Sequence, residues 1–153
     1  MAFDIFSGSN ISVELGKAGS TVSTQFNVIP EVAAFPSTGG ESAIINVKSF
    51  GSVYDRKLVG TRSQPDISLT VNWLPDDTQH IALLAAAENQ ERVQLRVTYF
   101  ENASKSTGYY TVLNGFISKD TITGDKDSVV TREFTFSVDG APVKTGLLPV
   151  AGE

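Results

Sequence analysis

Apolar and polar residues alternate along two stretches near the middle of the chain. Ile67, Leu69, Val71 and Trp73 alternate with polar residues, and the same pattern returns from 93 to 99. Because successive side chains of a strand point to opposite faces, each stretch predicts a half-buried strand with one apolar and one polar face. Similar or weaker patterns predict further strands at 11–15, 22–29, 43–48, 109–118 and 130–138.

A single helix is expected between the two clearest strands. Asp76 follows Pro75 and suits an N-cap, and Gln79 comes three residues later, as in a capping box. The stretch Ile81–Ala87 is mostly apolar and predicts a helix that covers an open side of a sheet. The fold class is therefore mainly β with one α-helix, as a β-sandwich or a partly closed β-barrel.

The 153 residues are expected to form one domain, 1–153, with an arm at each end. The N-terminal arm spans 1–9 and the C-terminal arm spans 143–153. Residues 50–64 have weak periodicity, so they predict a long loop or hairpin. This loop is rich in basic residues, which favours the alternative of a docking element for another protein. Asn114-Gly115 is expected to mark a β-bulge.

Composition excludes several classes of function. The chain has no cysteine, so it has no disulfide framework, zinc–thiolate site or thiol nucleophile. A net charge of −5 argues against a domain that grips nucleic acid by neutralising phosphates. The N-terminus lacks the pattern of a signal peptide, and no apolar run is long enough to span a membrane. A soluble product made in the cytoplasm is expected, without membrane insertion.

Candidate catalytic and metal-binding residues are few. His80 is the single histidine and lacks partners for a triad or a metal site, so a surface or cap position is expected. Asp120, Asp125 and Asp127 lack the spacing of an EF-hand and predict an acidic hairpin turn. Trp73 is expected in the core, with a stacking platform for a sugar or base as the alternative. We expect no enzyme activity, no cofactor and no metal.

The order of elements resembles that of the tail-tube (major tail) proteins of long-tailed bacteriophages. The resemblance covers about residues 40–142 and depends on a pattern of elements. The matching segments are a loop with Gly60 and Arg62, the strand Pro65–Trp73, the helix opened by Asp76–Gln79, the strand from Arg92 to Val97, Asn114–Ile117, and the closing segment Phe136–Gly140.

The resemblance implies a β-barrel-like fold whose copies form hexameric rings. Stacked rings would make the tail tube of a virion, a conduit that delivers genomic DNA into the host without specific binding. The implied partners are further copies of the chain and the tape-measure, terminator and baseplate or tip proteins. Related tubes occur in contractile tails and type VI secretion, and a non-contractile tail is expected here. The alternatives are a β-sandwich module that binds carbohydrate or a cell surface, and another tail component such as a terminator protein.

Two sets of residues are expected to serve this function. The inter-ring assembly loop contains Tyr54, Asp55, Arg56, Lys57 and Arg62. The polar strand faces supply the candidate lumen-facing residues Ser68, Thr70, Asn72, Gln94, Arg96, Thr98, Thr131, Glu133 and Thr135. Arg96 fits poorly, because a cation in the lumen would attract phosphate; a pairing of Arg96 with Asp66 or Glu133 is the alternative.

Overall fold

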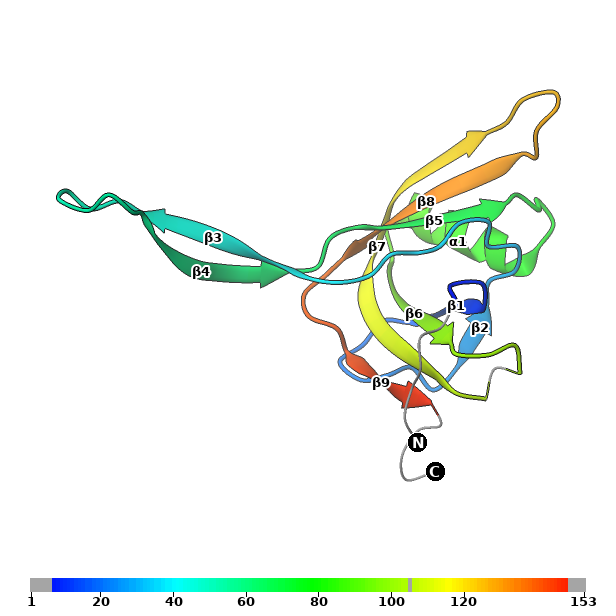
Figure 1. Cartoon of the computed structure of the whole chain (residues 1–153). Coiled ribbons are helices and arrows are strands. Elements are labelled where there is room, and N and C mark those ends of the chain that lie inside the picture. Colours follow the sequence, from blue (N-terminus) through cyan, green and yellow to red (C-terminus); the bar gives the residue numbers. More distant parts are fainter. Residues whose placement is uncertain (1–6, 105, 149–153) are drawn as a thin grey trace.

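A strand-rich body and a long projecting hairpin make up the molecule (Figure 1). The computed structural model describes residues 7–104 and 106–148. The main sheet has the strand order β2-β1-β6-β7-β8-β5, and β9 lies beside β7; β3 and β4 form a separate two-stranded sheet. The elements are β1 (Ile11–Lys17), β2 (Phe26–Val28), β3 (Glu41–Val47), β4 (Arg56–Ser63), β5 (Ile67–Asn72), α1 (Thr78–Asn89), β6 (Arg92–Phe100), β7 (Gly108–Thr123), β8 (Thr131–Val138) and β9 (Lys144–Leu148).

The long strand β7 joins the two halves of the main sheet. Its first half pairs with β6 on one edge and with β9 on the other, and from Gly115 onward it pairs with β8. At this transition a Cβ on Gly115 would collide with the carbonyl oxygen of Ser137, so glycine permits the close approach of the strands. The bulge expected at 114–115 is wrong, because the register shifts between Ile117 and Lys119.

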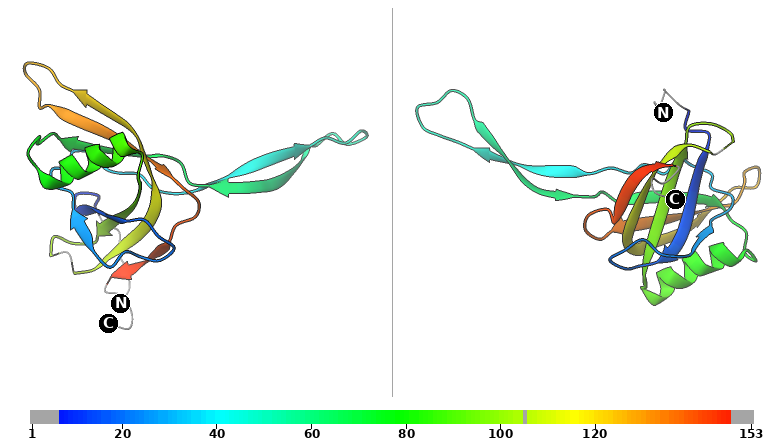
Figure 2. Two further views of the ribbon diagram at one scale, coloured as in Figure 1. Left: turned by 180° about the vertical axis from the view of Figure 1, so that it is seen from behind. Right: turned by 90° about the horizontal axis from the view of Figure 1, so that it is seen from below.

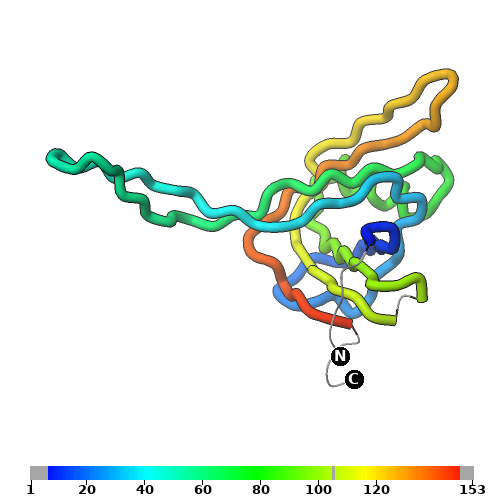
Figure 3. Tube along the Cα trace, viewed as in Figure 1, coloured from blue at the N-terminus to red at the C-terminus, as the bar shows by residue number. Residues whose placement is uncertain are grey.

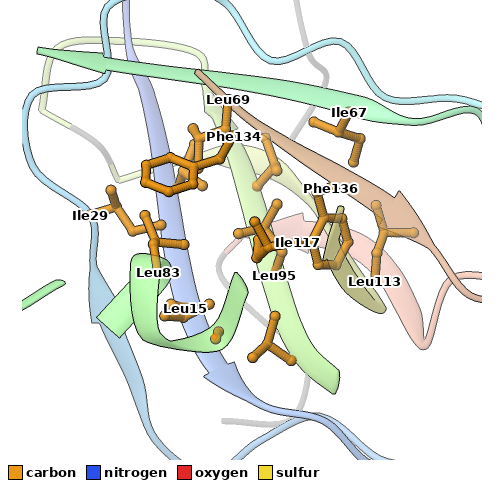
Figure 4. Close-up of a cluster of buried hydrophobic side chains, with 14 of the residues drawn as sticks. Leu15, Ile29, Ile67, Leu69, Leu83, Leu95, Leu113, Ile117, Phe134 and Phe136 are labelled. Carbon is orange, nitrogen blue, oxygen red and sulfur yellow. The ribbon is translucent and has the colours of Figure 1, made fainter. Parts of the chain in front are cut away.

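The core lies between the two halves of the sheet and is completed by the helix (Figure 4). Phe134 and Phe136 of β8 and Leu95 of β6 are fully buried, and Leu83 of α1 packs against the same cluster. The order of strands begins at β2 and ends at β5, so the sheet is not closed and the arrangement is sandwich-like. The predicted class, mainly β with one helix, is confirmed.

The start of α1 differs from the prediction by one residue. Asp77, not Asp76, is the N-cap, and its Oδ1 accepts hydrogen bonds from the backbone N–H groups of Gln79 and His80 at 2.9 and 3.2 Å. His80 lies in this first turn, but the surface position is wrong because its side chain is fully buried. Its Nδ1 accepts from the N–H of Leu74 at 3.1 Å. Its Nε2 contacts the carbonyl oxygen of Pro30 at 2.9 Å, so the ring links the helix to two loops.

Several predicted boundaries are also corrected. Of the loop or hairpin expected at 50–64, the hairpin is found: β4 begins at residue 56 and pairs with β3. Both faces of β4 are exposed, so its sequence shows no alternation. The C-terminal arm contains β9, which pairs with β7, and β7 itself continues into the turn expected from 120. The remainder of the two arms, 1–6 and 149–153, lies outside the described residues. No described helix has the length and apolar character needed to cross a membrane.

Candidate assembly surfaces

The β3–β4 hairpin projects far from the body (Figures 1 and 3). Several of its apolar side chains are exposed. Ile44 pairs with Val59 and Ile45 pairs with Leu58. Because neighbouring residues of a strand point to opposite faces, both faces of the hairpin carry an apolar pair. All four side chains are at least half exposed, from 50% for Ile45 to 72% for Val59. A two-stranded hairpin is at best marginally stable alone, and exposed apolar surface of this kind marks an interaction site.

The predicted assembly residues all lie on this hairpin. Tyr54 is strongly exposed in the turn at its outer end, and Asp55, Arg56 and Lys57 follow it, also exposed. Arg62 lies near the base, where its Nη1 donates to Ser42 Oγ at 3.4 Å. The structure therefore places four of these residues together at the outer end and separates the fifth.

The apolar pairs of the hairpin were missed by the sequence interpretation. Their signal is a pair of adjacent apolar residues on each strand, Ile44-Ile45 and Leu58-Val59. Alternation assigns only one member of each pair to a buried face, so it does not reveal that both members are exposed. Within the described residues no second layer covers either face of this hairpin, which makes it a candidate surface for a partner from outside the chain.

The segment that leads into the hairpin is fixed to the body by Tyr99. The Tyr99 hydroxyl lies 2.9 Å from both the carbonyl oxygen of Pro36 and Thr38 Oγ1, and donates to the former. Its ring stacks on Phe35 with a centroid distance of 5.3 Å. Burial raises the pKa of Tyr99 above its ordinary value, although the hydrogen bond with Thr38 opposes this. The entry to the hairpin is therefore anchored, whereas its outer part is uncovered.

The nine lumen-facing candidates lie on two different faces of the main sheet. Six of them share the outer face of β5 and β8, where Ser68 lies opposite Thr135, Thr70 opposite Glu133 and Asn72 opposite Thr131. This β5–β8 face is open: Ser68 is exposed and the other five are partly exposed. Its side chains are mainly hydroxyls and an amide. The carboxylate of Glu133 lies 3.8 Å from Lys119 of β7, which compensates its charge.

On the other polar face, that of β6, the loop that joins β1 to β2 covers Gln94. Gln94 is 0% exposed and Thr98 is 2% exposed, so neither side chain reaches open space in the single chain. Gln94 Oε1 accepts from the N–H of Ser23 at 2.7 Å, and its Nε2 donates to the carbonyl oxygen of Thr21 at 3.0 Å. Asn114 supports the same loop through a hydrogen bond from its Nδ2 to the carbonyl oxygen of Gly19. The expectation of an open polar face on β6 is therefore corrected.

Arg96 is neutralised by Glu14, which is neither of the two expected partners. Its Nε and Nη2 donate to the two carboxylate oxygens of Glu14 on the neighbouring strand β1. Its guanidinium carbon also lies 4.3 Å above the ring centroid of Phe26. The side chain of Glu14 is only 14% exposed, which strengthens the pair relative to a surface ion pair. The pairing expected with Asp66 or Glu133 is wrong.

No metal site is assembled in residues 7–104 and 106–148, and Trp73 packs into the body. No group of three or more His, Cys, Asp or Glu side chains gathers there. Trp73 packs between the ring of His80, at a centroid distance of 5.7 Å, and the guanidinium of Arg132, at 4.5 Å. Tyr110 is buried and Tyr109 is exposed. The core role of Trp73 is therefore confirmed, because it packs against the hydrophobic cluster.

A known protein family matches most of the chain. A sequence model described as phage tail tube protein, TTP, matches residues 9–145. The chain belongs to the phage tail tube protein family. The predicted resemblance is confirmed, and the family is one of structural tube proteins. No curated protein sequence matches the chain significantly.

Solved structures support the same tail tube fold. A chain from the tail of an empty gene transfer agent particle superposes with a TM-score of 0.68 at 17% identity, covering 90% of this chain and 97% of that chain. The SPP1 tail tube gives a TM-score of 0.64 at 10% identity, covering 94% and 78%. A chain of the anti-feeding prophage baseplate gives 0.68 at 10% identity, covering 99% of each chain. The fold is thus shared by phage tails, gene transfer agents and anti-feeding prophage particles.

Proposed function

We propose that this tail tube protein forms hexameric rings that stack into the tail tube of a virion, the conduit through which the genome enters the host. The observation that carries the proposal is the β3–β4 hairpin, whose two apolar faces have no covering layer in the described chain. Support for a sixfold ring comes from the similar gene transfer agent tail, whose helical refinement used C6 symmetry. The chain is made in the host cytoplasm and acts as a structural protein without catalysis.

The lumen wall in this proposal is the β5–β8 face. It carries Ser68, Thr70, Asn72, Thr131, Glu133 and Thr135. The hydroxyl-rich surface offers hydrogen bonds but no unpaired cation, and the net charge of the chain is −5. Phosphate neutralisation and counterion release would hold DNA in place, so an acidic chain with a weakly charged wall lets the duplex move. The proposed wall does not include Gln94 and Thr98, which are buried, or Arg96, whose charge is paired with Glu14.

The assembly contacts in this proposal are made by the hairpin. Tyr54, Asp55, Arg56 and Lys57 at its outer end, and Arg62 nearer the body, contact a neighbouring ring. Identical head-to-tail contacts close into a ring when the rotation closes, whereas stacking contacts stay open and propagate. The tape-measure, terminator and baseplate or tip proteins are the proposed partners along and at the ends of the tube. The non-contractile tail stays a prediction.

Electron microscopy of the purified chain tests the proposal directly. We expect rings or tubes of uniform diameter at high protein concentration, or after addition of the tail partners. Reversing the charge of Arg56, Lys57 and Arg62 together should weaken stacking while the unfolding curve stays unchanged, because all three side chains are exposed. A chain that stays monomeric at high concentration, and with its tail partners, would contradict the proposal.

Cysteine labelling tests the position of the wall. The chain has no native cysteine, so a single introduced thiol reports without background. Ser68→Cys should react with a small maleimide and with a protein-sized maleimide conjugate in the monomer, but only with the small reagent inside a tube. Glu88→Cys, exposed on α1, is the matched control and should keep both reactivities. Equal labelling of the Ser68→Cys tube by the large reagent would remove the β5–β8 face from the lumen.

A further inference from the structure

The two ends of the molecule carry opposite charge. In Figures 1 and 2 the β3–β4 hairpin points away from the body on one side, and the end of the β7–β8 hairpin points to the opposite side. The β3–β4 hairpin, from 41 to 63, carries four basic side chains against two carboxylates. We name it the basic hairpin. Its basic side chains are Lys48, Arg56, Lys57 and Arg62.

The opposite end is acidic and also carries uncovered apolar side chains. We define the acidic end as residues 120–131 with the adjoining segment 74–77, which contain five aspartates and one lysine. The N–H of Trp73 donates to the carbonyl oxygen of Val130 at 3.0 Å and holds the two segments together. Ile122, Val129, Val130 and Leu74 are all exposed. Asp76, Asp125 and Asp127 are exposed beside them.

The acidic end exists because β7 and β8 continue beyond the core. Their last pairs, Ile122 with Arg132 and Thr123 with Thr131, lie past the region that β6 accompanies. The pairing of β6 with β7 stops at Phe116, so from Ile117 to Thr123 the strand β7 has a strand neighbour on one edge only. An exposed strand edge with apolar side chains is a template for another chain.

We infer that the basic hairpin of one copy docks on the acidic end of a second copy. This inference depends on the proposed function, since it names the surface that receives the hairpin. The pair Ile45–Leu58, which shares a face of the hairpin with Arg56, supplies apolar surface for Ile122, Val129 and Val130. Arg56 and Lys57 then lie beside Asp125 and Asp127.

Charge makes this pairing selective. Two basic hairpins repel each other, and so do two acidic ends, so contact between like ends is disfavoured. Contact between unlike ends joins different surfaces of identical copies, and such a head-to-tail contact can repeat without limit or close into a ring. The apolar contacts supply most of the binding free energy, and the charges select the partner.

A charge exchange between the two ends tests the inference. The first variant combines Arg56→Glu with Lys57→Glu, and the second combines Asp125→Lys with Asp127→Lys. Each variant alone should need a concentration about tenfold higher for half-maximal association, because like charges then meet at the contact. An equimolar mixture should associate as readily as the unmodified chain, since each reversed hairpin finds a reversed end. Association is measured by sedimentation velocity at low salt.

A matched control separates this contact from a general effect of charge. Glu88→Lys with Glu91→Lys changes the net charge by the same amount as the second variant, but on an exposed surface at the end of α1. This control should change association less than about twofold. Thermal unfolding of each variant checks that the body is intact. A second variant whose association equals that of the unmodified chain overturns the inference even where tubes form. A mixture that fails to associate also overturns it, whether or not the unmodified chain forms tubes.

Discussion

Strands β5 and β6 have the same alternation of apolar and polar residues, but their polar faces have different surroundings. Ser68 on β5 is exposed, whereas Gln94 on β6 is fully buried. Alternation determines which residues share a face of a sheet. Whether that face is open depends on another part of the chain, here the loop between β1 and β2. A polar strand face is therefore a candidate surface only after the loops have been placed.

The side chains on the two faces also differ in kind. Gln94 offers both a donor and an acceptor, and it bonds to the backbone of Ser23 and Thr21, more than seventy residues away in the sequence. Serine and threonine are shorter, and on β5 and β8 Ser68 stands opposite Thr135 without such a loop. A long amide can thus satisfy the backbone of a covering loop, whereas a row of hydroxyls stays available to solvent.

The largest effect is expected at Gly115, where β7 passes from its pairing with β6 to its pairing with β8. Gly115→Ala places a methyl group against the carbonyl oxygen of Ser137, and β7 cannot pass from β6 to β8 without moving. We expect a loss of about 3 kcal/mol in the free energy of unfolding, measured by urea denaturation. Gly19→Ala is the control, because its nearest contact is the carbonyl oxygen of Thr21 at 3.9 Å. Equal stability of the two variants would contradict the transition at Gly115.

The covered face should be more sensitive than the open face to the loss of one polar side chain. Gln94→Ala leaves the N–H of Ser23 and the carbonyl of Thr21 without their partner, at a cost of about 2 kcal/mol. Thr70→Ala, on the open face, should change stability by less than about 0.5 kcal/mol. Urea denaturation of both variants gives the comparison. Similar costs would mean that the loop does not cover β6 in solution.

The two ion pairs give a smaller contrast of the same kind. Glu14→Gln weakens the charge pairing with Arg96, and we expect a loss of about 1 kcal/mol because Glu14 is largely buried. Glu133→Gln removes the charge of an exposed carboxylate 3.8 Å from Lys119 and should cost only a few tenths of a kcal/mol. The loss of unfolding free energy on Glu133→Gln should depend on salt concentration more strongly than the loss on Glu14→Gln. An equal and strongly salt-dependent loss would show that both pairs are solvated.

The smallest expected effect is a pH dependence that involves Tyr99. Burial raises its pKa in the folded chain, so the unfolded tyrosine ionises first, near its ordinary value of about 10. The contribution to stability is complete below that pH and is lost as the pH rises through the folded pKa. Tyr99→Phe should reduce the decline in unfolding free energy between about pH 9 and 11. Tyr109→Phe is the control, and an equal reduction there would contradict the assignment to Tyr99.

Local patterns predicted most of the body. The alternation in β5, β6 and β8 identified the core residues, and β6, Arg92–Phe100, contains the whole alternating stretch from 93 to 99. The helix was found from its cap and apolar stretch, with the N-cap displaced by one residue because Asp76 and Asp77 are both suitable capping residues. Features of this kind depend on residues that are close together in the sequence, so the sequence alone could predict them.

Contacts between segments that are far apart in the sequence could not be predicted in the same way. The burial of His80 depends on the carbonyl of Pro30, and the neutralisation of Arg96 depends on Glu14. The strand β4 was missed because both of its faces are exposed in the single chain, which removes the alternation that marks a strand. The candidate wall residues were therefore predicted as the polar positions of strands. Which of them lie on an open face and which are covered could be assigned only from the fold.

The uncovered hairpin has a consequence for how an assembly would start. A two-stranded arm that is marginally stable alone loses conformational entropy when it docks, and this cost falls on the first few copies before enough contacts exist to offset it. Growth on an existing end would then be fast, whereas spontaneous nucleation would be slow. With the hairpin as the docking element, free chain can accumulate without forming stray filaments, and the site at which a template is supplied determines where polymerisation begins.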